Sequence, residues 1–130
     1  MSIELLKNRI INATVIAIDP DGSGALQMGQ DLIVAAGISS FEKILVLNRE
    51  TGNRFDTYVE SVAEPGMVCC TGTDARNVDP GDRIDILVFR EMDELDYPSD
   101  YRPRTITVDE KNQVVSWVWA LLISPNPYDK

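Results

Sequence analysis

Short apolar segments rich in β-branched residues recur along this chain, and turn residues separate them. Two of the turns, Pro65-Gly66 and Pro80-Gly81, have the composition of type II turns. This pattern is typical of short strands rather than long helices. We expect strands at 9–18, 25–28, 43–48, 54–62, 67–71, 84–89 and 104–108, and a short helix at 30–36 that ends at Gly37. The predicted fold class is mainly β with short helices, arranged as a small barrel or sandwich.

The chain of 130 residues is long enough for one domain with a buried core. We assign residues 1–112 to a β domain and residues 113–130 to an apolar C-terminal strand and tail. The tail would pack on the same domain or on a subunit interface. Trp117 and Trp119 point the same way if 113–123 is extended, so they are expected to be core or interface residues. A flat apolar wall for a larger substrate is the alternative use.

The composition excludes several classes of function. The net charge is −9 and no basic cluster occurs, so neither nucleic acid nor an anionic membrane surface is an expected partner. The chain has no histidine, which removes the commonest zinc ligand and the usual general base. The adjacent Cys69 and Cys70 would point to opposite faces of a strand, so buried reduced thiols in a cytoplasmic protein are expected. No segment predicts a signal peptide or a membrane helix.

The polar turn at 19–25 can reverse the chain, bind a cation or hold a peptide bond that breaks. Asp19, Asp21, Ser23 and Gly24 match the opening of an EF-hand loop over 19–30. However, Gln30 stands where that loop needs a bidentate glutamate, and the preceding residues favour a strand over a helix. A turn stabilised by an aspartate side chain is therefore favoured over calcium, and we predict no metal site.

Several segments, taken in order, form a pattern that extends over roughly residues 5–112. They are Asp31-Leu32, Ala35-Ala36-Gly37-Ile38, Asn48, Gly52, Arg54-Phe55-Asp56-Thr57-Tyr58, Gly72, Gly81-Asp82 and Tyr101-Arg102-Pro103. In order and spacing they resemble the pyruvoyl-dependent aspartate 1-decarboxylases. The resemblance implies a double-psi β-barrel and a homo-oligomer, expected to be a tetramer, with active sites between subunits.

The resemblance also implies roles for individual residues. In that family a Gly-Ser bond breaks itself and leaves a pyruvoyl group, which binds the substrate amine and acts as an electron sink. Arg54 matches the arginine that holds the substrate carboxylate, and Tyr58 matches the tyrosine that returns the proton. Thr57 lies beside them as a substrate-binding residue.

The sequence departs from the family where the chain should cleave itself. Without gaps the Gly-Ser pair falls on Gly24 and Ala25, and alanine has no hydroxyl with which to attack. Arg9 replaces the family's lysine, and Gly22 replaces its tyrosine. The family's asparagine falls on Thr71, which precedes the remaining candidates for the pocket, Gly72, Thr73 and Asp74. The carboxylate of Asp74 should repel a dicarboxylate substrate.

A second register preserves the chemistry. A shift by two residues places the reactive pair on Gly22 and Ser23, with Lys7 as the lysine, and would keep strand side chains on their own faces. The pyruvoyl group would then derive from Ser23.

We therefore expect a decarboxylase-like barrel that has lost self-cleavage and uses no cofactor. It would bind a small anionic or carbonyl-bearing molecule through Arg54, with Arg9 and Asp74 as weaker contributors. Tyr58 would transfer a proton in an isomerisation, cyclisation or dehydration, as in natural-product biosynthesis. The alternative is an active aspartate 1-decarboxylase of the pantothenate pathway, cleaved at Gly22-Ser23.

Overall fold

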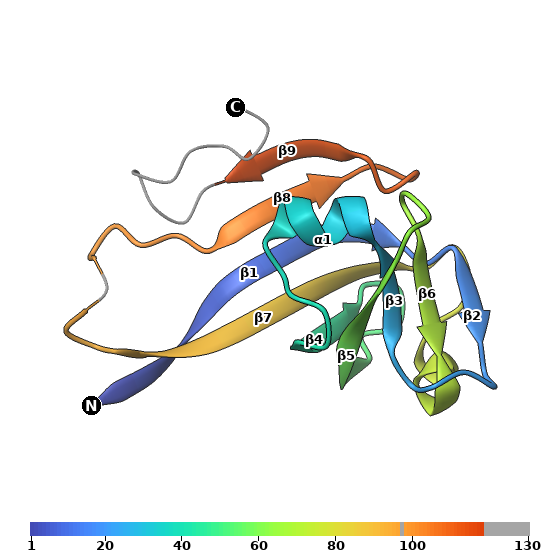
Figure 1. Ribbon diagram of the computed structural model, residues 1–130, viewed down its shortest axis with the longest axis horizontal. Helices are drawn as coiled ribbons and strands as arrows, with labels where there is room; N and C mark the ends of the chain where they lie inside the picture. Colours follow the sequence, from blue (N-terminus) through green and yellow to red (C-terminus); the bar gives the residue numbers. More distant parts are fainter. Residues whose placement is uncertain (97, 119–130) are drawn as a thin grey trace.

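The computed structural model describes residues 1–96 and 98–118, which form strands with two short helical segments (Figure 1). In chain order the elements are β1 (Ser2–Thr14), β2 (Ala17–Asp19), β3 (Leu26–Gly29), α1 (Gln30–Ala36), β4 (Lys43–Asn48), β5 (Arg54–Val62), β6 (Val68–Thr71), the 3-10 helix η1 (Gly72–Asn77), β7 (Arg83–Asp93), β8 (Arg104–Val108) and β9 (Val114–Val118). The predicted fold class, mainly β with short helices, is confirmed.

The strands form a single sheet in the order β2-β6-β3-β5-β4-β7-β1-β8-β9. Three pairs are parallel, β2 with β6, β3 with β5, and β1 with β8. Parallel neighbours need crossover connections, so the chain passes across the barrel instead of forming a simple meander. Among the described strands the sheet does not close on itself, because β2 and β9 end the order.

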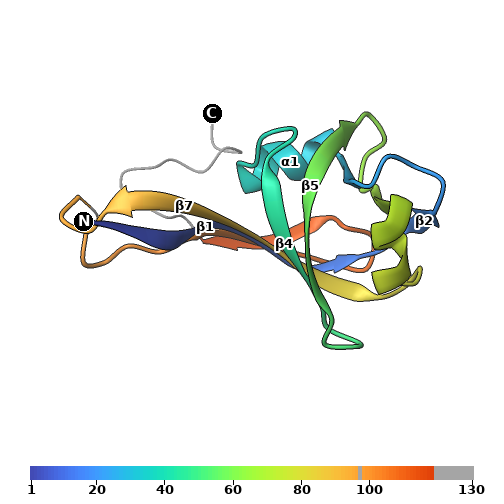
Figure 2. The same ribbon diagram turned by 90° about the horizontal axis from the view of Figure 1, so that it is seen from below.

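The longest pairing joins β1 and β7 into a ribbon that extends beyond the other strands, as Figure 2 shows from below. The pairing runs from Ser2 opposite Asp93 to Thr14 opposite Arg83. Two predictions are corrected here. The strand expected at 9–18 begins at Ser2, and the strand expected at 84–89 extends from Arg83 to Asp93. Both corrections arise because each strand finds its partner far along the chain.

The predicted strand also breaks near its end, between Thr14 and Ala17. Val15 donates its amide hydrogen to the carbonyl of Asp82 at 2.9 Å, whereas Ile16 donates to Val68 at 2.8 Å. Val15 and Ile16 thus bond to different neighbours, and the chain passes from the β7 side of the barrel to β6. This change of partner brings β2 and the turn after it next to η1.

The core lies between the inner face of the sheet and α1. Fully buried side chains from almost every strand contribute to it, among them Ile10, Leu26, Met28, Ile44, Val46, Val59, Val68, Ile86 and Ile106. The helix ends as predicted at Gly37, whose φ of 73° is left-handed and whose amide bonds to Ile33 and Val34. Asn8 reaches from β1 to the last helical carbonyl, that of Ala36, at 2.7 Å. Burial and these contacts fix α1 against the sheet.

The hairpin of β8 and β9 attaches the C-terminal strand to the same sheet. Its turn contains Asn112, which is buried and has a left-handed φ of 60°. The Asn112 amide donates to the carbonyls of Thr14 at 2.9 Å and Gly66 at 2.8 Å, and its oxygen accepts from the Thr14 amide at 2.7 Å. The strand predicted at 113–123 is observed at 114–118; Trp119 and the remainder lie outside the described residues.

Candidate functional site

The turn at 19–25 connects β2 to β3 and is held first by its own aspartate. The Asp19 carboxylate accepts from the amide of Asp21 at 3.1 Å, and the Asp19 carbonyl accepts from the amide of Gly22 at 3.1 Å. These bonds form the aspartate-stabilised turn that the sequence favoured. Strands flank the turn on both sides, where an EF-hand loop requires helices. Among the described residues no group of three or more possible metal ligands comes together.

The second half of the turn is buried beneath two threonines. Ala25 is fully buried, and Gly24 has a φ of 99°, which favours glycine. The Thr57 hydroxyl donates to the carbonyl of Gly24 at 2.9 Å. The Thr71 hydroxyl accepts from the amides of Gly24 at 3.1 Å and Ala25 at 2.9 Å, and donates to the carbonyl of Ala25 at 3.0 Å. The peptide bond between residues 24 and 25 is therefore held at both of its ends.

This arrangement does not fit a pyruvoyl group at residue 25. The hydrogen bond from Thr57 would polarise the carbonyl that a nucleophile must attack, but residue 25 presents only a methyl group. The Ala25 side chain has no hydroxyl with which to form the ester that would precede such a group. The Gly24 carbonyl thus accepts a hydrogen bond from Thr57, and the residue that follows it has no side-chain hydroxyl.

The second register is no better supported by geometry. Ser23 is exposed, and the threonine hydroxyl donates to the carbonyl of Gly24, not to that of Gly22. Lys7, the lysine of that register, donates to the Glu42 carboxylate at 3.1 Å. Moreover β1 has irregularities between Leu6 and Asn8 and between Ile10 and Ala13. The expectation that a two-residue shift keeps every side chain on its face is therefore wrong, because these bulges break the alternation.

Strand β5 separates the other predicted site residues. Side chains alternate between the two faces of a strand, so Arg54 and Tyr58 share one face and Thr57 lies on the other. The burial agrees, since Arg54 is exposed, Tyr58 half-buried and Thr57 buried. We call the side with Arg54 and Tyr58 the outer face. Within one chain, the turn at 19–25, which Thr57 contacts, and the pair Arg54 and Tyr58 are on opposite sides of the sheet.

Arg9 belongs to the outer face as well. Directly paired residues share a face, and the register Asp56–Leu45–Leu87–Arg9 runs across β5, β4, β7 and β1. Arg9 donates its Nε hydrogen to the hydroxyl of Thr105 at 3.0 Å. The structure thus brings Arg9, Arg54 and Tyr58 onto one surface, with Arg9 tied to β8.

The remaining candidates lie in η1, beside the turn. A Cβ built on Gly72 would come within 2.5 Å of the Gly24 Cα, so only glycine fits there. Thr73 is exposed and Asp74 is half-buried. Burial, together with the negative charge of Asp74, raises the pKa of the Cys70 thiol to about 12. A hollow of about 310 Å³ lies alongside, lined by Ile18, Pro20, Gly72, Thr73, Ala75 and Arg76.

Two features of the site were not anticipated from the sequence. The sequence marks Thr71 only as a replacement for an asparagine, although its hydroxyl makes three hydrogen bonds to the turn. The outer face also carries a groove of about 320 Å³, lined by Glu4, Lys43, Ile44, Leu45, Asp56, Leu87 and Phe89. The groove forms where the projecting ribbon meets β4 and β5, a tertiary relation that local patterns do not reveal.

The comparisons with known proteins agree on one family. Residues 1–115 match the family described as aspartate decarboxylase. The chain is 38% identical over 117 residues to aspartate 1-decarboxylase of Acetivibrio thermocellus, covering 89% of this chain and 92% of that protein. It is 35% identical over 112 residues to the Campylobacter jejuni subsp. doylei enzyme of that name, covering 86% and 88%. The Leptospira biflexa counterpart is 34% identical over 114 residues, covering 87% and 97%. No helix among the described residues is long and apolar enough to cross a membrane.

Proposed function

This chain belongs to the aspartate decarboxylase family, whose fold is the double-psi β-barrel, and we propose that it is an uncleaved member that acts on a small carboxylate. The observation that carries the proposal is the methyl group of Ala25 beneath the bond from Thr57 to Gly24. The family's usual electron sink has no oxygen from which to form at that position.

Arg54 supplies the binding group in this proposal. Its guanidinium is exposed on the outer face, and no ion pair or hydrogen bond joins it to another side chain in the described part of the chain. A planar guanidinium presents paired donors that match the two oxygens of a carboxylate. Arg9 and Asp74 contribute more weakly, Asp74 by disfavouring a second carboxylate on the substrate.

Tyr58 supplies the proton transfer. A phenol hydroxyl beside a bound substrate can give a proton to one carbon or oxygen and accept one from another. This permits isomerisation, cyclisation or dehydration without a cofactor. A homotetramer would bring the outer face of one chain toward the turn of another, so that Thr73 and Gly72 join Tyr58 around a single pocket.

An active aspartate 1-decarboxylase is the second candidate, and the names of the relatives favour it. In this case the chain would be cleaved between Gly22 and Ser23. The substrate would then be L-aspartate, and the product β-alanine.

Intact mass of the purified protein separates the two candidates. We expect one species at 14.5 kDa after prolonged incubation. The control Ser23→Ala should also give one full-length species, lighter by the mass of one oxygen atom. A fragment of residues 1–22 together with a large fragment bearing a ketone would overturn our proposal and establish the decarboxylase. Ser23→Ala should then remain whole, which would assign the cut to that serine.

A further inference from the structure

Phe41, in the loop between α1 and β4, combines an exposed aromatic ring with a disfavoured backbone. Its side chain is 69% exposed, and its φ is 67°. A bulky residue rarely adopts the left-handed region, because its Cβ approaches the neighbouring carbonyl. Of the three non-glycine residues with positive φ in the described ranges, the other two are Asn12 and Asn112. Asparagine tolerates this conformation, so Phe41 is the exception.

Core packing does not account for the exception, since most of the ring is open to solvent. The backbone is fixed instead by the sheet: the Phe41 amide donates to the Val59 carbonyl at 2.7 Å, and the Val59 amide donates to the Glu42 carbonyl at 3.1 Å. Any residue other than proline could make these main-chain bonds. Strain that persists at an exposed side chain points to a role for that side chain outside folding.

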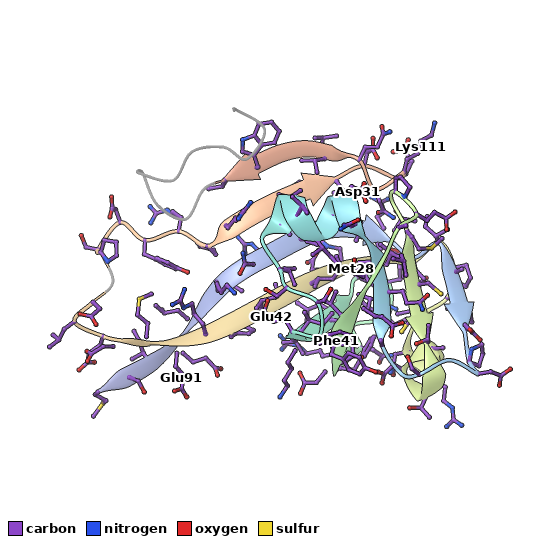
Figure 3. All side chains as sticks on the ribbon, in the orientation of Figure 1. Met28, Asp31, Phe41, Glu42, Glu91 and Lys111 are labelled. Carbon is purple, nitrogen blue, oxygen red and sulfur yellow. The ribbon has the colours of Figure 1, made fainter. Side chains whose placement is uncertain are left out.

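The ring lies beside Tyr58. The two ring centroids are 6.3 Å apart, and the planes are tilted by 31°. Figure 3 shows Phe41 and Glu42 in the loop that runs beside β5. Phe41 therefore extends the outer face with a second aromatic surface next to the proposed proton donor.

Arg54, the cation proposed to bind a carboxylate, lies on the same strand as Tyr58. Arg54 and Tyr58 are four residues apart on β5, which at roughly 3.3 Å per residue separates their Cα atoms by about 13 Å. The groove of about 320 Å³ on the same face is lined by Leu45 and Leu87, by the Lys43 side chain, and by the carboxylates of Glu4 and Asp56. The two side chains leave the same face of β5, so a molecule with a carboxylate at one end and a flat apolar group at the other can contact both.

We infer that Phe41 determines specificity: with Tyr58 it forms an aromatic wall for the flat apolar group of a carboxylate that Arg54 binds. The substrate class is an aromatic or extended unsaturated monocarboxylate. This inference rests on the proposed function and adds to it the nature of the substrate.

Two probes test the inference, trans-cinnamate and crotonate, which share an unsaturated carboxylate and differ by a phenyl in place of a methyl group. Calorimetric titration of the full chain should show cinnamate binding about tenfold more tightly, because a ring against aromatic side chains adds offset or edge contacts. Phe41→Asn should remove this preference and leave crotonate affinity unchanged. Arg54→Gln should weaken both probes.

The stability of Phe41→Asn distinguishes specificity from a structural role. Asparagine suits the left-handed backbone, so the melting temperature should stay the same or rise. Leu95→Asn is the matched control, because Leu95 is an apolar residue, 86% exposed, in the loop that follows the end of β7. It should keep the preference for cinnamate.

The outcomes separate this inference from the function on which it rests. Equal affinity for the two probes, each dependent on Arg54, would overturn the role of Phe41 and leave the carboxylate site intact. Binding of neither probe would overturn both. A change in sedimentation mass on Phe41→Asn would also overturn the inference, because it would make the ring a contact between chains.

Discussion

The hydroxyl of Thr57 donates to the carbonyl oxygen of Gly24 at 2.9 Å. This carbonyl directly precedes Ala25, so the bond lies where a nucleophile at residue 25 would attack. The chain retains a group that would stabilise a developing oxyanion and lacks the group that would generate it. The contact makes the cleavage chemistry testable by restoring one atom.

Ala25→Ser should restore cleavage. The new hydroxyl would lie beside a carbonyl that already receives a hydrogen bond, and the expected products are fragments 1–24 and 25–130. Intact mass spectrometry over several days would detect them. The double variant Ala25→Ser, Thr57→Val should cleave far more slowly, and Ala25→Val should remain whole. A full-length Ala25→Ser chain would show that the turn blocks the reaction for a reason other than the missing oxygen.

Thr71→Val should destabilise the turn. Valine has nearly the same shape, but it removes the hydroxyl that accepts from two amides and donates to the carbonyl of Ala25. Leaving such buried groups unpaired should lower the free energy of unfolding by about 1–3 kcal/mol. Urea unfolding would measure the change. Thr71→Ser, which keeps the hydroxyl, should lose less, and equal losses in the two variants would contradict this account.

Asn112→Ala should have a larger effect on stability. The substitution removes three hydrogen bonds to Thr14 and Gly66, and places alanine at a φ of 60°. We expect a loss of about 2–4 kcal/mol in the free energy of unfolding, measured in urea. Gln113→Ala, at the exposed neighbouring position, should stay within about 0.5 kcal/mol of the parent. A similar loss in both variants would contradict the view that the Asn112 side-chain hydrogen bonds stabilise the fold.

The Cys70 thiol should make the protein less stable at high pH. Burial raises its pKa from an ordinary value of 9.0 to about 12, so over this interval the unfolded chain loses a proton that the folded chain keeps. The stabilising contribution is complete below pH 9 and is lost as the pH rises toward 12. From pH 8 to 10 the free energy of unfolding should fall by roughly 1 kcal/mol on this account. The fall should be smaller in Cys70→Ala. An identical dependence of the free energy of unfolding on pH in both proteins would show that the Cys70 thiol does not cause it.

Local sequence patterns predict those helices and strands whose signals lie within the element itself. The helix at 30–36 with its left-handed Gly37, and the strands at 43–48, 54–62 and 104–108, have the predicted bounds. They were found because their alternation and their turn residues are contained within one short window. The first half of β1 is not evident from the sequence, because the adjacent Leu5 and Leu6 interrupt the alternation that Ile3 and Glu4 begin. Its pairing with the end of β7 depends on residues at the far end of the chain.

The candidate site was predicted as a set of residues, whereas its geometry was not. Thr57 and Tyr58 are neighbours in sequence, but adjacent strand residues point to opposite faces, so they contact different parts of the protein. The backbone of Phe41 could not have been predicted, because nothing in its neighbours indicates a left-handed residue. The bulges in β1 are equally hidden, and they decide which residues share a face with Arg9.

The alternation along β5 has a consequence for how this protein should behave when diluted. If catalysis requires both the turn at 19–25 and Arg54 in one pocket, a monomer has no activity. Specific activity would then climb with protein concentration and level off once assembly is complete. Dilution would therefore inactivate the protein reversibly, because neighbouring residues of one strand point to opposite faces of the sheet.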